Sequence, residues 1–391
     1  MRILSFVLLL SLGAILRAQD LANLAPNTWV KLKLTVEQPE GVGADEKGQY
    51  CADGWNKLVY DPLGKRVLFY DRWLDKKHGG YTIYGNCLFS YDPAAGKLQP
   101  VKLDNWGKID KDGGYRTVVL PENEKTPTPC PRHVYNCFEY IPELKSLFLC
   151  NGANGSAQDG SKFGSDLCED TWRLDVEKKV WTKVNSTQHP KNYPLDAGMA
   201  YCPDTKSIVM TMAGSIWILD VASGQWRKAK NSTPACGMGQ TVAYDPLRKR
   251  MILAGGPTSD LSAPAPANGR NETAGMKIYA FDPKTETVTK LADCSTPLYE
   301  MALTYDAKHD LFFVANYMKE GESFPSGLFA YDPKKDAWSE AKTANRPPDA
   351  KSWFGWVRMC YDIEHDCFIG MVRNGTNYET EFYALRYVPQ K

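Results

Sequence analysis

The chain has 391 residues, and its 47 Lys and Arg nearly balance its 46 Asp and Glu, which gives a net charge of +1 at pH 7. Such a balance produces no long-range field that attracts polyanions, so nucleic acid and anionic membranes are excluded as first choices of partner. Hydrophobic residues make up 43% and charged residues 24%, which excludes a disordered chain. The many aromatic residues, Gly and Pro favour strands and turns.

The first 18 residues have the pattern of an export signal. Arg2 is a small basic start, the stretch 3–16 is apolar, and Ala18 is a small residue suited to cleavage. The apolar stretch is shorter than the about 18–20 residues that span a bilayer. We therefore expect residues 1–18 to be a signal peptide, and residues 19–391 to form a single domain that is secreted or periplasmic.

One unit recurs along the chain: an apolar strand ending in an aromatic residue, a short polar segment that is Asp-Pro in its clearest copies, and a second apolar strand. The copies begin at Tyr60, Tyr140, Tyr201, Tyr244, Tyr305 and Tyr361. In the clearest copies, Asp can accept a hydrogen bond from the backbone two residues further on, and Pro presets φ at the next position. Each copy therefore predicts a tight hairpin between two short strands.

A second series of similar hairpins alternates with the first. Its copies are at Tyr91, Leu174, Leu219, Phe281, Tyr331 and Tyr387, and in three of them a Trp follows seven positions later, at Trp181, Trp226 and Trp338. Two hairpins make one four-stranded antiparallel unit, and six such units follow one another. No 3.6-residue period persists long enough for a substantial helix. Six tandem units predict a six-bladed β-propeller, because radial closure leaves few exposed strand edges.

The two ends of the chain complement each other. The last unit stops at 387–389, before a fourth strand can form, whereas Trp29-Val30-Lys31-Leu32 resembles the fourth-strand segment Trp181-Thr182-Lys183-Val184. We therefore expect residues 27–35 to complete the last blade and close the ring. Deletion of residues 19–36 is then expected to abolish cooperative folding.

These residues resemble a known family. The Tyr-Asp-Pro…Trp hairpin and the Gly255-Gly256 pair at the end of an inner strand are similar to kelch-type β-propellers, and the similarity covers essentially the whole mature chain. The paired glycines are intact only in the fourth unit and are reduced to Asn151-Gly152 in the second and Ala213-Gly214 in the third. The resemblance implies the fold and leaves the activity open.

Loop lengths indicate which face of the propeller is expected to carry binding or catalytic residues. The hairpin turns of both series are short and share one rim, here named the short-turn face. The longer connections share the opposite rim, here named the long-loop face: 71–84, 104–136, 151–170, 255–275, 316–326 and 343–356. Long loops on a rigid scaffold are where binding and catalysis concentrate, although insertions can also simply be tolerated there.

One candidate group lies where the chain enters the second blade. Arg132, His133 and Tyr135 offer a guanidinium for a carboxylate, an imidazole near neutral pKa, and a phenol. The trio is suited to binding an acidic sugar or moving protons on it. The alternative comes from the resemblance, since kelch blades frequently begin with Pro-Arg followed by His, and these side chains tie neighbouring loops together.

A second group of candidates lies at other blade entrances. Trp353 and Trp356 are suited to stacking on sugar rings, and Arg358 to pairing with an anion near the pore. The corresponding positions of two other blades add the binding candidates Asp53, Trp55, Tyr299 and Glu300. Packing between blades is the alternative role for these aromatic residues.

The sequence gives little support to a metal or cofactor. Asp110-Lys111-Asp112-Gly113 has the opening spacing of a calcium loop but lacks its later ligands. The five His are dispersed, so the ligand set of a copper-radical oxidase with a kelch propeller cannot be assembled. No Gly-rich phosphate loop, His-Glu-x-x-His or Gly-x-Ser-x-Gly occurs in the sequence. We expect neither metal nor cofactor.

Eleven Cys fit an oxidising compartment, and the odd number leaves at least one thiol outside any intramolecular pair. Cys137 and Cys150 can face one another across the second blade's inner hairpin, and Cys236 and Cys294 both lie between blades on the long-loop face. The alternative for each is a buried free thiol that packs as a small hydrophobic group.

These observations favour a monomeric, exported kelch-type propeller that binds a carbohydrate or an extracellular protein through its long-loop face. The alternative is an epimerase or lyase acting on an acidic sugar. Some exported six-bladed kelch proteins that epimerise sialic acid are similar to this chain in size and export. Under that alternative, Arg132, His133 and Tyr135 would carry the reaction.

Overall fold

Short strands separated by tight turns make up nearly all of the molecule. The structure is a computed structural model, and it describes residues 20–37, 56–75, 82–101, 129, 134–152, 169–190, 197–212, 214–233, 237–256, 276–295, 302–316, 327–347, 357–374 and 379–390. Two single-turn 3-10 helices, Leu21–Asn23 and Pro142–Leu144, are the helices among these residues. Within the same ranges, no helix has the length and apolar content needed to cross a bilayer.

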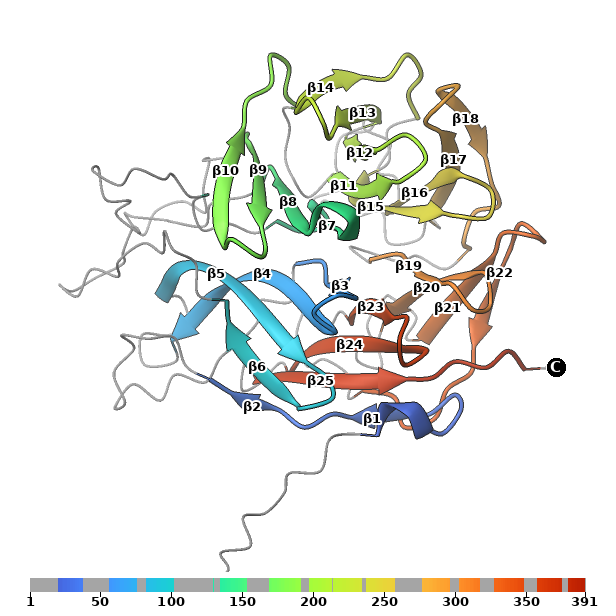
Figure 1. The fold of residues 1–391 in the computed structure, drawn as a ribbon. Coiled ribbons are helices and arrows are strands. Elements are labelled where there is room, and N and C mark those ends of the chain that lie inside the picture. The colour runs from blue at the N-terminus through green and yellow to red at the C-terminus, as the bar shows by residue number, and fades with distance from the viewer. Residues whose placement is uncertain are drawn as a thin grey trace, which may run out of the picture.

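The strands form six sheets, here named blades 1–6 in chain order (Figure 1). Blade 1 contains β3 (Val59–Asp61), β4 (Arg66–Asp75), β5 (Thr82–Asp92) and β6 (Lys97–Pro100), and blade 2 contains β7 (Phe138–Ile141), β8 (Ser146–Cys150), β9 (Thr171–Asp175) and β10 (Val180–Val184). Blade 3 contains β11 (Ala197–Cys202), β12 (Ser207–Met212), β13 (Ser215–Asp220) and β14 (Gln225–Lys228), and blade 4 contains β15 (Gly237–Asp245), β16 (Arg250–Gly256), β17 (Lys277–Asp282) and β18 (Thr287–Lys290). Blade 5 contains β19 (Thr304–Asp306), β20 (Leu311–Asn316), β21 (Gly327–Asp332) and β22 (Ala337–Ala341), and blade 6 contains β23 (Arg358–Asp362), β24 (Cys367–Asn374) and β25 (Glu379–Leu385).

The six blades form a closed ring. Their innermost strands β3, β7, β11, β15, β19 and β23 contact one another in that order, and β23 contacts β3. Six apolar clusters fill the spaces between neighbouring blades, including the space between blades 6 and 1. The structure thus confirms the predicted all-β, six-bladed propeller, in which burial between sheets supplies the core.

The recurring sequence unit forms the predicted hairpins. At the first of them, Asp61 Oδ1 accepts hydrogen bonds from the backbone N–H of Leu63 at 3.1 Å and of Gly64 at 3.0 Å. Asp362 Oδ1 does the same for Glu364 at 3.0 Å. In each case the carboxylate accepts hydrogen bonds from backbone N–H groups of the turn, which lie outside the hydrogen-bonded pairing of the two strands.

The repeated Trp residues link neighbouring blades. Trp226 pairs with Leu219 across strands β13 and β14, and its indole N–H donates to Thr171 Oγ1 of blade 2 at 2.9 Å. Trp338 pairs with Tyr331, and its N–H donates to the Ala292 carbonyl of blade 4 at 3.2 Å. The Trp on the outermost strand therefore holds each of these blades to the previous one.

The N-terminal segment lies along the outer edges of two blades. Strand β1 (Trp29–Lys31) pairs antiparallel with β25, with Trp29 opposite Leu385. Further along, β2 (Thr35–Val36) pairs parallel with β6. Blade 1 therefore has five strands where the sequence predicted four, because the segment continues past blade 6 and meets a free outer edge.

Candidate functional site

Most of the predicted site residues lie outside the described part of the chain. These are Arg132, His133, Asp53, Trp55, Tyr299, Glu300, Trp353 and Trp356. The proposed signal peptide, Cys236 and the rejected calcium loop at 110–113 also lie outside it. Of the candidates, the structure places Tyr135 and Arg358.

Tyr135 is held between blades 1 and 2 by its backbone. Its N–H donates to Asn56 Oδ1 at 3.1 Å, and its carbonyl accepts from the Lys57 N–H at 2.8 Å. Its φ of 49° is in the left-handed region, which a non-glycine residue adopts at a cost. The side chain is buried. These contacts fix the chain direction just before β7.

Arg358 is buried within the ring. Only 1% of its surface is exposed, and its Nη1 donates to Asn136 Oδ1 of blade 2 at 3.2 Å. Asn136 Nδ2 donates in turn to the Gln240 carbonyl of blade 4 at 2.8 Å. These two side chains and the Gln240 backbone, here named the polar layer, connect alternate blades. Anion binding by Arg358 stays a prediction.

The polar layer requires close approach of the innermost strands. A Cβ at Gly198 would lie 2.6 Å from the Gln240 carbonyl oxygen and 2.6 Å from Thr241 Cα, so only glycine fits there. The Gln240 side chain accepts from Thr211 Oγ1 of blade 3 at 2.7 Å. Blades 3 and 4 are thereby joined beside the layer.

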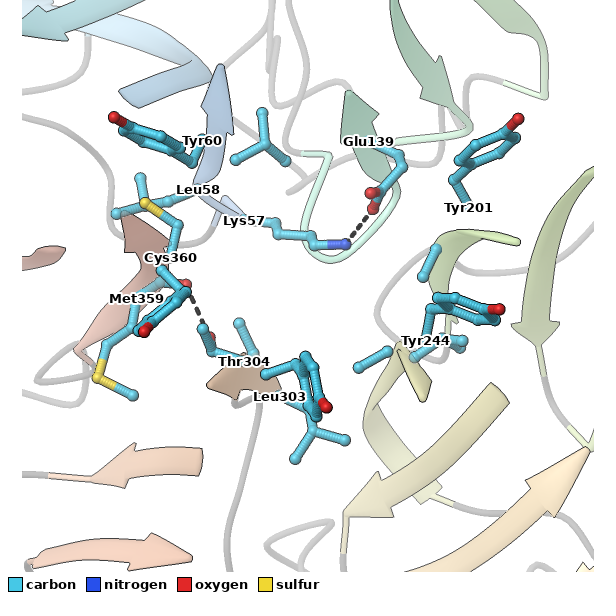
Figure 2. A pocket seen from close by; sticks show the side chains of 17 residues that line it. Lys57, Leu58, Tyr60, Glu139, Tyr201, Tyr244, Leu303, Thr304, Met359 and Cys360 are labelled. Carbon is cyan, nitrogen blue, oxygen red and sulfur yellow. Dashed lines mark hydrogen bonds and ion pairs between the residues drawn. The ribbon is translucent and has the colours of Figure 1, made fainter. Parts of the chain in front are cut away.

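A buried ion pair lies next to the polar layer. Lys57 extends from blade 1 to Glu139 on β7, and its ammonium donates to Glu139 Oε2 (Figure 2). The same ammonium donates to the Met199 carbonyl of blade 3 at 2.9 Å. The two side chains are only 11% and 17% exposed. One lysine therefore contacts blades 2 and 3 at once.

Burial has the largest effect on the titration of Glu139. It raises the pKa of Glu139 above its ordinary 4.5, because the charged carboxylate loses water. The Lys57 ammonium and the Tyr201 backbone N–H act in the opposite direction by stabilising the carboxylate. The carboxyl group is thus held in an environment where its charge depends on Lys57.

The ion pair lines a cavity of about 200 Å³ at the centre of the ring. Side chains from all six innermost strands or the residues beside them surround it, as Figure 2 shows. The wall combines apolar residues with the charged pair, five tyrosines and Thr304, whose hydroxyl donates to the Met359 carbonyl at 2.9 Å. Tyr60, Tyr201, Tyr244, Tyr305 and Tyr361 form its end nearest the short-turn face.

Sequence reasoning missed Lys57 and Glu139, although the repeat contains a signal for both. At the position before the hairpin Tyr, the other five units have Val59, Ala200, Ala243, Thr304 and Cys360, so Glu139 is the single charged residue in that column. Three positions before the Tyr, Lys57 and Arg358 are the charged members. A charge at a repeat position that is otherwise small or apolar indicates a buried polar contact.

The predicted Cys137–Cys150 disulfide is wrong. Both residues are buried and are not bonded to each other, and Cys294 is buried as well. The Cys150 N–H donates to the Cys137 carbonyl at 3.1 Å, so the two are backbone neighbours, but the Cys150 sulfur accepts from Thr171 Oγ1 at 3.3 Å. Burial raises the pKa of the Cys137 thiol well above 9.0. These groups pack as small hydrophobic side chains.

Among the described residues, no three His, Cys, Asp or Glu side chains gather closely enough to hold a metal ion. No protein-family model and no curated protein matches this chain. A closed six-bladed propeller suggests, in general terms, a module for binding or interaction.

Proposed function

We propose that this chain is an exported, monomeric kelch-type propeller that binds a carbohydrate or an extracellular protein at its long-loop face. The kelch assignment is supported by the Tyr-Asp-Pro hairpins and by the Trp residues that link one blade to the previous one. Export is supported by the sequence pattern of residues 1–18.

One observation carries the choice of face. Strands of a blade alternate in direction, so the connections after the second strand and between blades leave the same end of the ring. All connections of more than about seven residues between named strands are of this kind. Directly inside this end, the polar layer and the Asn56 contacts tie the first residues of several blades together. A rigid base under variable loops is the usual arrangement of a binding surface.

Trp353 is the residue that tests this proposal. We expect Trp353→Ala to weaken retention of the mature protein on a glycan array or on immobilised extracellular protein at least tenfold, because an aromatic stacking surface is lost. Trp338→Phe is the matched control, since Trp338 lies on the outer hairpin of blade 5. Equal retention by wild type and Trp353→Ala, with both folded, would contradict the proposal.

The enzymatic alternative gives a different result in a parallel assay. An epimerase or lyase that uses Arg132, His133 and Tyr135 would turn over a uronate or sialate substrate, and His133→Ala would abolish turnover while leaving the fold intact. Turnover of that kind would replace the binding-module proposal. Retention that is insensitive to His133→Ala and sensitive to Trp353→Ala supports it.

A further inference from the structure

The central cavity contains unused hydrogen-bonding capacity. An ammonium group has three donors, and Lys57 uses two of them, on Glu139 and on the Met199 carbonyl. Among the described residues, its third N–H has no acceptor. Glu139 accepts from Lys57 and from the Tyr201 N–H, which leaves lone pairs of its two oxygens free. A donor and an acceptor thus lie side by side at the cavity wall.

The cavity wall carries no net charge. Lys57 and Glu139 are the charged residues among those that line it, and they are paired with each other. In a site with little water, a ligand with a net charge would be left without a counter-ion and would weaken the existing pair. A neutral ligand avoids this penalty. A hydroxyl group suits the wall best, since it can accept from Lys57 and donate to Glu139 at once.

The size of the cavity limits the ligand further. Its volume of about 200 Å³ is below the roughly 300–1,000 Å³ of sites for drug-sized molecules. The remaining wall includes the apolar residues Leu58, Val242, Leu303 and Met359, whose side chains pack mainly into the clusters between blades and leave a small apolar surface to the cavity. These surfaces suit the C–H faces of a small polyol or a single sugar ring.

We propose that this cavity, lined by Lys57 and Glu139, is a second binding site that takes a small neutral polyol or monosaccharide. The polar layer separates it from the long-loop face, and the partly exposed tyrosines around Tyr201 and Tyr244 form the end through which a ligand enters. The site does not depend on the loops that carry the proposed function.

Titration of the mature protein with D-glucose, myo-inositol and D-glucuronate, followed by calorimetry and ligand-detected NMR, tests the site. We expect saturable binding of glucose or inositol and at least tenfold weaker binding of glucuronate. Trp353→Ala leaves these affinities unchanged, which separates this site from the long-loop face. Absence of glucose and inositol binding, or a preference for glucuronate, overturns the proposal.

Glu139→Gln provides a change of preference that a structural role would not produce. It keeps the size of the side chain but leaves Lys57 as an unpaired cation, so we expect glucose affinity to fall at least tenfold and glucuronate affinity to rise. Glu177→Gln, in an exposed pair with Lys145, is the matched control. Unchanged preference in folded Glu139→Gln overturns the proposal.

A second variant covers the case in which Glu139→Gln does not fold. Ala243→Leu adds three carbons at a residue that lines the cavity, without altering a charge. We expect it to abolish glucose and inositol binding in the folded protein. Retained binding by this variant would show that the ligand lies elsewhere, and would overturn the proposal.

Discussion

At the residue scale, the Lys57–Glu139 pair is the most consequential contact in the central cavity. Two charges are taken from water and are compensated mainly by each other and by the Met199 carbonyl. A buried pair adds little net stability over apolar residues, but removal of one partner leaves an uncompensated charge. The two members of the pair should therefore be strongly coupled.

We predict that Lys57→Met lowers the free energy of unfolding by about 3–5 kcal/mol at pH 8. Without the ammonium, burial raises the pKa of Glu139 further. A carboxyl group whose pKa is higher in the folded than in the unfolded chain destabilises the fold as the pH rises above the unfolded pKa. The loss should consequently be smaller at pH 5. Urea unfolding at the two pH values measures both effects.

The double variant Lys57→Met, Glu139→Leu should recover most of that stability, because it leaves no buried charge. Lys65→Met serves as the control, since Lys65 forms an exposed pair with Glu364 and its loss should leave stability nearly unchanged. If the double variant is no more stable than Lys57→Met, the coupling is absent.

The sequence predicted the turn carboxylates but not this pair, for a physical reason. Asp61 acts within a few residues, so its role follows from local backbone geometry. Lys57 and Glu139 are 82 residues apart and meet only because blades 1 and 2 are neighbours. Their contact depends on the ring, and it can be anticipated only by aligning the repeats.

At the element scale, the inner hairpins are linked to one another on the short-turn face. Arg248 donates to Asp245 Oδ1 of its own hairpin at 3.0 Å and to Asp310 Oδ2 of the next hairpin at 2.9 Å. Tyr305 Oη also donates to Asp310 at 3.1 Å. Lys308 similarly contacts Asp366 of blade 6. The turn residues therefore both shape each hairpin and hold it to its neighbour.

These links make the short-turn face sensitive to acid. Chiefly through the Arg248 hydrogen bond, the pKa of Asp310 is lowered from 3.8. A carboxylate of this kind stabilises the fold above its unfolded pKa, and its contribution is lost as pH falls through the lower folded pKa. We predict that Asp310→Asn reduces stability at pH 7 and makes the decline below pH 3.8 shallower, as measured by urea unfolding.

Arg248→Met provides the reference for this measurement. Since Arg248 is the main cause of the lowered pKa, Asp310→Asn should have a much smaller effect on the pH dependence in the Arg248→Met background. An equal effect in both backgrounds would show that the link between the two hairpins is not what stabilises the carboxylate.

The hairpins could be predicted from the sequence because one short pattern recurs along it. The aromatic residue, the turn and the second apolar run define each hairpin, and Trp181, Trp226 and Trp338 mark outer strands. Strand β2 was not predicted, because a parallel partner such as β6 contributes no turn between the two strands. The six-bladed fold and a place for the N-terminal segment beside the last blade followed from the repeat pattern, whereas the β2–β6 pairing did not.

At the scale of the whole molecule, the N-terminal segment packs into the spaces on both sides of blade 6. Leu21, Leu24 and Leu32 belong to the cluster between blades 6 and 1, and Trp29 belongs to the cluster between blades 5 and 6. Strand β1 also pairs with β25. The N-terminal segment thus contributes to two of the six interfaces between blades.

From these contacts we predict that deletion of residues 19–36 abolishes the single cooperative unfolding transition, because blade 6 loses its outer strand and both flanking clusters lose apolar side chains. A synthetic peptide of residues 19–36 added in trans should restore the transition, since the site it vacates is an open strand edge, whereas a scrambled peptide should not. Val30→Lys, a change on an exposed position of β1, should leave the melting curve unaltered. A deletion variant that melts as the mature chain does would mean that the ring is held closed by the remaining apolar contacts between blades 6 and 1 alone.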